Sequence, residues 1–151
     1  MESRRPIPLY SRKADQSVDV IARLAEPARI ECVGPIAVRF IYSLRLIAVH
    51  EHARLDPVAE LSVRLGSVTA ASASLGLASA IARFWPEDIQ ISRFCCRAMT
   101  HDEATIAAMV EHACDRRRRE FENLLAGLIR PARVVKLWDH AIELVVAESH
   151  G

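Results

Sequence analysis

The chain of 151 residues is 51% hydrophobic and 26% charged, a composition typical of one globular domain that can bury a core without disulfides or metal ions. Lys plus Arg number 20 and Asp plus Glu number 19, so the formal net charge of +1 disfavours a general polyanion binder. An aromatic content of 5% is also low for a protein that stacks single-stranded bases.

Alanine and arginine, two strong helix formers, dominate the composition. The chain has 23 Ala, and Arg supplies 18 of its 20 basic residues, whereas Gly occurs only five times. We therefore expect an all-α fold: a compact bundle of about five helices, with at most a short β element near Ile30 or Ile89.

The first residues show neither hydrophobic periodicity nor a signal-peptide core, so residues 1–16 are expected to form a mobile N-terminal tail. Residues 17–147 are expected to form a single helical domain, because neither a linker nor an internal repeat interrupts them. Within this domain, Ser17 can cap a short helix that ends before Pro27. Residues 29–33 alternate weakly, as a short strand would.

The first strong helix is expected over residues 35–54. Pro35 suits the first helical position, where its missing N–H group costs nothing. An apolar face recurs at intervals of three and four residues, whereas Arg39, Arg45 and His52 fall mostly on the other side. The members of the apolar face are Ile36, Phe40, Ile41, Leu44, Ile47 and Ala48.

A second helix is expected from Asp56 and Pro57 to about Phe84. Its middle part is rich in Ala, Ser and Gly, and side chains of this size let another helix approach closely. That partner is either the helix over residues 35–54 or a second copy of the chain. We favour the second copy and expect a homodimer.

Two glycines and a long uncharged run make this second helix unusual. Gly66 and Gly76 each weaken a helix, so it should pack on more than one face or contain a kink. Residues 65–82 carry no charge, but their Ser and Thr content favours a buried helix over a membrane span.

Residues 87–94 break the helical pattern, and their alternation of Ile with polar residues indicates a short extended stretch. Thr100 and Glu103 then fit a capping box at the start of a helix over residues 102–114. The carboxylates of Asp102 and Glu103 also suit the positive end of the helix dipole.

The last third of the chain is expected to contain two more helices. We favour a break at Asp115, which would cap a new helix with an apolar face beginning at Phe121, over continuation of the preceding helix. Pro131 begins the final helix, and the chain is expected to fray from Glu148 onward.

The four cysteines are expected to be reduced thiols of a cytoplasmic protein, because no secretory signal precedes them. Cys95, Cys96 and Cys114, together with His101, are the candidate ligands of a soft metal ion. Adjacent cysteines on an extended segment point to opposite sides, so a single four-ligand site is awkward. Core packing without any cofactor is the favoured interpretation.

If the chain has a functional site, we expect it at the entrance to the helix that follows Thr100. Free backbone N–H groups there can bind an anion or stabilise a thiolate. Because Arg97 adds positive charge beside Cys96, we expect Cys96 to be the most reactive thiol. Cys95 is then expected to face the core beside Phe94. The candidate residues of the helix entrance are Arg97, Thr100, Asp102 and Glu103.

One sharp charge run, a candidate basic patch, consists of Arg116, Arg117, Arg118 and Arg119. Four consecutive helical positions spread over all sides of a helix, and acidic residues on both flanks partly neutralise the run. A solvated surface is therefore favoured over nucleic-acid binding. The chain contains no Gly-rich phosphate loop, serine elbow or arranged catalytic triad, so an enzyme is not favoured.

One block of the sequence resembles a family of small alphaproteobacterial proteins. The block is Cys95-Cys96-Arg97-Ala98-Met99-Thr100-His101-Asp102-Glu103-Ala104, supported by residues 45–50 and by the small-residue helix. Members carry a cysteine-rich segment followed by an Arg-Met-Thr-x-Asp-Glu helix start, and the resemblance covers residues 36–146. It implies a bacterial cytosolic protein and no particular activity. Members often have three consecutive cysteines, and Phe94 takes the first place here, which weakens a metal site built on three thiolates.

These patterns favour a small cytosolic binding or regulatory module that acts through a protein partner, because no catalytic constellation emerges. The first alternative is a thiol- or metal-dependent sensor or enzyme that uses Cys95, Cys96 and Cys114. The second alternative is a nucleic-acid binder that acts through residues 116–119.

Overall fold

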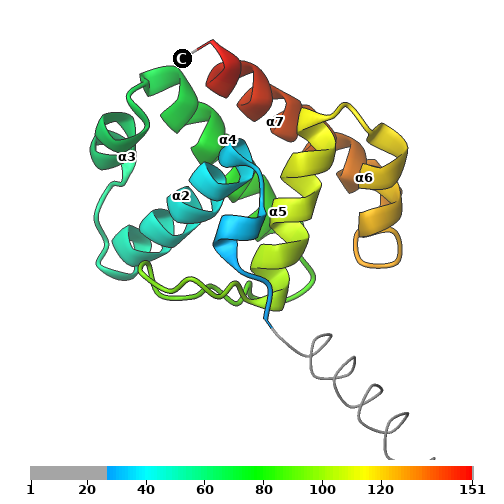
Figure 1. Ribbon diagram of the computed structural model, residues 1–151, viewed down its shortest axis with the longest axis horizontal. Coiled ribbons are helices and arrows are strands. Elements are labelled where there is room, and N and C mark those ends of the chain that lie inside the picture. The colour runs from blue at the N-terminus through cyan, green and yellow to red at the C-terminus, as the bar shows by residue number, and fades with distance from the viewer. Residues whose placement is uncertain (1–26, 151) are drawn as a thin grey trace, which may run out of the picture.

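Six α-helices and one short 3-10 helix make up the regular structure of the part of the chain that the computed structural model describes, residues 27–150 (Figure 1). The all-α prediction is confirmed, with six helices in place of about five. The predicted tail over residues 1–16 and the predicted helix after Ser17 lie outside the described residues. The elements are η1 (Ile30–Cys32), α2 (Pro35–His52), α3 (Val58–Leu65), α4 (Val68–Phe84), α5 (His101–Cys114), α6 (Arg118–Leu125) and α7 (Pro131–Ser149).

The single helix predicted from Pro57 to Phe84 is wrong, because the chain breaks into α3 and α4 at Gly66. Gly66 has a φ of 70°, a left-handed conformation that glycine adopts without a steric penalty and that often ends a helix. The hydroxyl of Ser67 then accepts a hydrogen bond from the Ala70 N–H at 3.1 Å and so begins α4. The sequence predicts either a kink or extra packing at the glycines. At Gly66 the helix does more than kink, because it ends there and a new helix begins.

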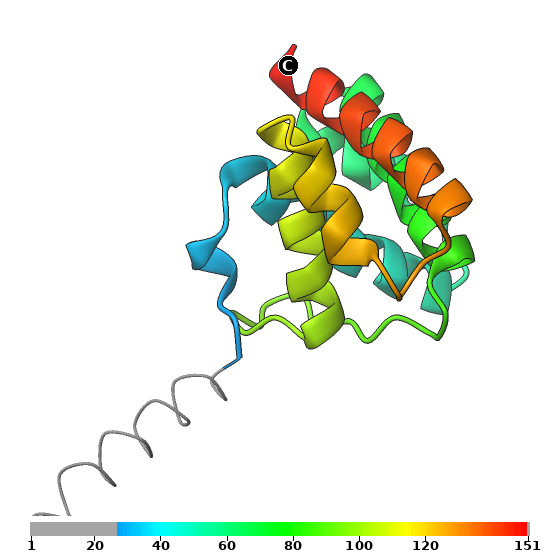
Figure 2. The same cartoon turned by 90° about the vertical axis from the view of Figure 1, so that its right-hand side faces the viewer.

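The sequence allowed at most a short β element near Ile30 or Ile89, and none is seen, since residues 27–150 contain no β-strand. Ile30 begins the 3-10 helix η1, and its N–H donates to the Arg97 carbonyl at 2.8 Å. The segment before η1 and the segment before α5 form one isolated antiparallel bridge, between Arg29 and Ala98, which is too short to be a strand pair. Figure 2 shows η1 at the edge of the bundle, where the chain before it meets the segment that precedes α5.

The other helix ends agree closely with the local signals. Pro35 and Pro131 occupy the first turns of α2 and α7, and Thr100 forms the predicted capping box. The predicted break after α5 is present, but Asp115 follows the end of α5 and does not cap α6. Fraying from Glu148 is not seen, because α7 continues to Ser149.

The buried apolar side chains form one continuous cluster that all six helices share. Helix α5 lies between α2 and the pair α6 and α7, while α4 packs along α7, α3 and α2 (Figures 1 and 2). The small residues of α4 therefore face mainly α7, which is not the intramolecular partner that the sequence suggested. None of the helices among residues 27–150 combines the length and the apolar character needed to span a membrane.

Candidate functional site

A fully buried ion pair, Arg45 with Glu103, lies at the point where α2 passes the start of α5. Arg45 Nε donates to Glu103 Oε2 at 2.7 Å, and both side chains are completely shielded from solvent. The helical pattern places Arg45 mostly on the polar face of α2, and this prediction is wrong. A buried charge is stable only when it is paired and hydrogen-bonded, and Glu103 supplies the first of those partners.

The remaining donors of Arg45 hold the segment that joins α4 to α5. Its Nη1 donates to the Cys96 carbonyl at 2.6 Å and to the Phe94 carbonyl at 3.4 Å, and its Nη2 donates to the Ala98 carbonyl at 3.2 Å. One guanidinium therefore fixes three alternate carbonyls of a segment that has no regular structure. Among the described residues no buried side-chain N or O atom lacks a hydrogen-bond partner.

Asp102 and Glu103, in the first turn of α5, also bind the segment that joins α4 to α5. Glu103 Oε1 accepts from the Ser92 N–H at 2.7 Å and from the Thr100 N–H at 3.4 Å. Asp102 accepts from the Gln90 N–H at 2.9 Å and from the indole N–H of Trp85 at 3.3 Å. The chain's own carboxylates therefore occupy the helix entrance that the sequence suggested for an external anion. Arg97 is exposed at its edge.

The cysteines do not gather as a metal site would require. Cys114 lies at the far end of α5, roughly 20 Å along the helix from the segment that carries Cys95 and Cys96. His101 is exposed at the first position of α5. No three His, Cys, Asp or Glu side chains within residues 27–150 come together in a way that could hold a metal ion. All four cysteines are free thiols.

The predicted orientation of the adjacent thiols is wrong. Cys95 is exposed and Cys96 is half-buried, whereas the sequence placed Cys95 in the core. Arg45 explains the difference, since it draws the Cys96 carbonyl inward and leaves Cys95 on the outer side of the turn. At the other end of α5, burial raises the pKa of the Cys114 thiol, and the carboxylates of Asp115 and Glu111 add to this effect.

The four consecutive arginines lie at the junction of α5 and α6, and all four are exposed. Arg116 has a φ of 56° in the connection, and Arg117 precedes the first residue of α6. Arg118 pairs with Glu122 at 3.1 Å, and its guanidinium lies 5.7 Å from the centroid of the Trp138 ring. Arg118 is therefore already engaged by Glu122 and Trp138, and the proposal of a basic patch over residues 116–119 stays a prediction.

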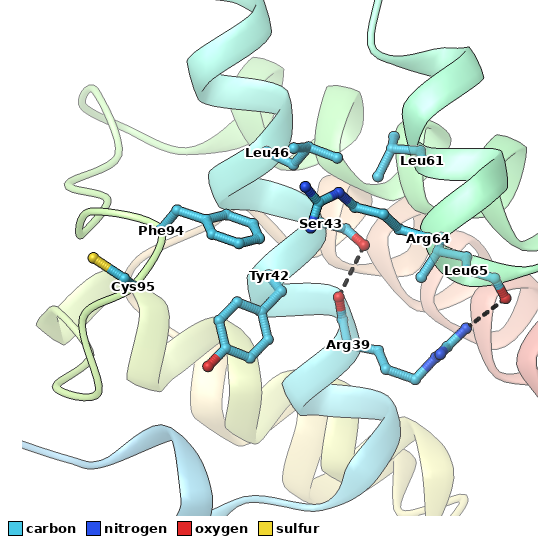
Figure 3. A pocket seen from close by; sticks show the side chains of 9 residues that line it. All are labelled: Arg39, Tyr42, Ser43, Leu46, Leu61, Arg64, Leu65, Phe94 and Cys95. Carbon is cyan, nitrogen blue, oxygen red and sulfur yellow. Dashed lines mark hydrogen bonds between the residues drawn. The ribbon is translucent and has the colours of Figure 1, made fainter.

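A groove that the sequence analysis missed runs between α2, α3 and the turn at Phe94 (Figure 3). Its volume is about 410 Å³, within the range of pockets that hold small molecules. We call it the α2–α3 groove. It is lined by Arg39, Tyr42, Ser43, Leu46, Leu61, Arg64, Leu65, Phe94 and Cys95.

The walls of the α2–α3 groove are apolar. Leu46 and Leu61 come from the two helices, and Phe94 comes from the segment that Arg45 anchors. The Phe94 ring lies 5.5 Å from the Tyr42 ring, centroid to centroid. Cys95 lies at the outer edge, beside Phe94 (Figure 3). The buried ion pair therefore sets the position of one wall of the groove.

Two guanidinium groups border the groove. Arg64 reaches from α3 toward the opposite wall, where its guanidinium lies 5.1 Å from the centroid of the Phe94 ring (Figure 3). Arg64 also pairs with Glu60 at 3.0 Å. Arg39 pairs with Glu148 and donates to the Leu65 carbonyl at 2.9 Å. Both arginine side chains are about half exposed, at 42% for Arg39 and 51% for Arg64, so both remain accessible from the groove.

Comparisons with protein-family models, with curated proteins and with solved structures find no match for this chain. The resemblance of residues 95–104 to the alphaproteobacterial family stays a prediction.

Proposed function

We propose that this chain is a small cytosolic binding or regulatory module whose α2–α3 groove receives one large apolar side chain of a protein partner. The observation that carries the proposal is the groove itself, an apolar cleft of about 410 Å³ bordered by two accessible guanidinium groups. Interfaces gain most of their affinity where an aromatic or aliphatic anchor fills such a pocket.

The charges at the border indicate the chemistry of the partner. Glu60 and Glu148 already pair with Arg64 and Arg39, so the border is not a strong anion site by itself. Each guanidinium nevertheless keeps N–H donors toward solvent, since it has five and its pairs use only some of them. A partner segment with Asp or Glu beside its apolar anchor fits this border, because rim charges select the partner and speed its association.

Two probes test the proposal on the full chain. The first is 8-anilinonaphthalene-1-sulfonate (ANS), which combines an apolar aromatic body with one negative charge. The second is a displayed library of random peptides. We expect ANS to bind and to be displaced by the selected peptides, and we expect those peptides to share a Trp, Phe or Leu next to Asp or Glu.

Arg64→Glu is the decisive variant, and Arg83→Glu is its matched control. Arg83 is also exposed and its guanidinium also lies 5.1 Å from an aromatic ring, that of Phe84, but it lies outside the groove. Reversal of one half-exposed charge should cost about 1 kcal/mol of binding, which weakens both probes about fivefold in Arg64→Glu. Equal weakening in both variants, or no binding of either probe to the natural chain, would refute the proposal.

The alternative of a thiol-dependent sensor has one observation in its favour. Cys95 is exposed at the edge of the groove and is followed directly by Cys96. Within residues 27–150 no group of three His, Cys, Asp or Glu side chains could hold a metal ion, so this observation favours the thiol form of the alternative.

A further inference from the structure

Two adjacent thiols lie on the turn that forms one wall of the α2–α3 groove. The Cys96 N–H donates to the Arg93 carbonyl at 3.0 Å and so closes the turn. Cys95 is exposed, Cys96 is half-buried, and neither is bonded to another cysteine. Cys95 is therefore the more accessible of the two residues for small reagents in solution.

A bond between these sulfurs would be a strained one. Consecutive Cα atoms are about 3.8 Å apart across a trans peptide, whereas ordinary disulfides join Cα atoms that are about 4.4–6.8 Å apart. Strained and exposed disulfides are reduced more easily than structural ones, and such bonds are the labile, regulatory kind. The adjacency of the thiols thus suits a bond that forms and breaks repeatedly.

We propose that Cys95 and Cys96 form a reversible oxidation site that controls the α2–α3 groove. The site itself stands on the two thiols, and its control of binding rests on the proposed function of the groove. The oxidant is hydrogen peroxide, and a dithiol reverses the reaction.

The chemistry balances in two steps. The Cys95 sulfur attacks one oxygen of hydrogen peroxide, the O–O bond breaks, and the products are a sulfenic acid and water, which takes up the thiol proton. The Cys96 sulfur then attacks the Cys95 sulfur, the S–O bond breaks, and the hydroxyl group leaves with the second thiol proton as water. The two thiols lose two electrons in total, and the peroxide gains them.

Closure of this ring must disturb the groove wall. The ring contains the peptide between Cys95 and Cys96, so we expect its closure to turn that peptide and to weaken the hydrogen bond from its N–H to the Arg93 carbonyl. Phe94 precedes this peptide and would shift from its contacts with Tyr42 and Arg64. The oxidised chain is therefore expected to bind groove ligands more weakly.

The hydrogen bonds on either side of the turn let it regain its original conformation when the disulfide is reduced. Arg45 and Glu103 are fully buried and lie outside the ring, so we expect their hydrogen bonds to the flanking Ala98 carbonyl and Ser92 N–H to persist, whereas the bonds from Arg45 to the Phe94 and Cys96 carbonyls must adjust to the ring. With both ends of the turn held in this way, opening of the disulfide lets the Arg93–Cys96 hydrogen bond form again.

The first experiment detects the bond directly. The full chain is treated with equimolar hydrogen peroxide, free thiols are blocked with iodoacetamide, and the product is digested with trypsin. Cleavage after Arg93 and Arg97 releases the peptide Phe94–Arg97, which contains both thiols. We expect this peptide to be unalkylated and two hydrogen masses lighter than the reduced form, and dithiothreitol should restore two alkylation sites. Alkylation of both thiols after peroxide, or a crosslink to Cys32 or to a second chain, would overturn the proposal.

A second experiment tests control of the groove, with ANS as the probe and Cys96→Ser as the variant that cannot form the bond. Peroxide should weaken ANS binding about fivefold in the natural chain and clearly less in Cys96→Ser, where oxidation of Cys95 stops at the sulfenic acid and no ring closes. A disulfide that forms without any change in ANS affinity would overturn the control of the groove. If the reduced chain binds no ANS, the proposed function fails, whereas the peptide mass still decides the oxidation site.

Discussion

Replacement of Glu103 by Gln is expected to lower the free energy of unfolding by about 3 kcal/mol. Both carboxylate oxygens accept hydrogen bonds, Oε2 from Arg45 and Oε1 from the N–H groups of Ser92 and Thr100. The amide nitrogen of Gln would therefore face a donor in either orientation. Loss of one partner from a buried pair costs about 3–5 kcal/mol, and the three carbonyls that Arg45 keeps place this site at the lower end.

The measurement is thermal unfolding of the full chain followed by far-ultraviolet circular dichroism. In a chain of this length each 1 kcal/mol lowers Tm by about 2–4 °C, so we expect a decrease of about 6–12 °C. Glu122→Gln is the matched control, because it breaks the exposed pair with Arg118 and should cost only about 0.3–0.5 kcal/mol. If the two variants lose the same amount, the buried pair does not anchor the segment before α5 as we infer.

Four further results are expected. Gly66→Ala should lower the free energy of unfolding by about 1 kcal/mol in urea denaturation, because the φ of 70° strains Ala while its Cβ meets nothing within 4 Å. Gly76→Ala should raise it by up to about 1 kcal/mol, since its Cβ would lie 3.5 Å from His140 Nδ1, an ordinary contact, and Ala favours the helix; a loss of stability would show that α4 and α7 need glycine here. The pKa of Cys114 is raised from its ordinary value of 9.0, so less of it is thiolate at neutral pH. Iodoacetamide should then alkylate Cys114 more slowly than exposed Cys95, and equal rates would contradict this reasoning. Light scattering should give twice the chain mass of 16.8 kDa for the predicted homodimer, and a single-chain mass at micromolar concentration would refute it.

Local signals were enough for most helix ends. The capping box at Thr100 and the prolines at the start of α2 and α7 act within one turn of the chain, so they have the same meaning in the sequence and in the fold. The sequence also contains the signals for the break between α3 and α4, since Gly66 can end a helix in a left-handed conformation and Ser67 can cap the next one. It was missed because the apolar content on both sides continues without interruption.

The sequence predicts that Asp102 and Glu103 lie at the start of a helix. Which groups these carboxylates bind is seen only in the tertiary structure. Asp102 and Glu103 suit a helix dipole wherever the helix lies, and that is all the sequence can say. Their actual partners include Trp85 and the backbone of residues 90–92, which the sequence does not place. These hydrogen bonds explain how residues 85–100 keep one backbone conformation without forming a helix or a strand.

The sequence by itself determined the helical class, most helix ends and the apolar faces, because periodicity and capping depend on neighbours within a few residues. Only the tertiary structure decided that Arg45 is buried, since its partner Glu103 lies 58 positions away and its other acceptors are backbone carbonyls. The α2–α3 groove depends on the same long-range contacts. Its walls come from two helices and a turn, and the turn is held in place by a buried guanidinium that a helical pattern assigns to the surface.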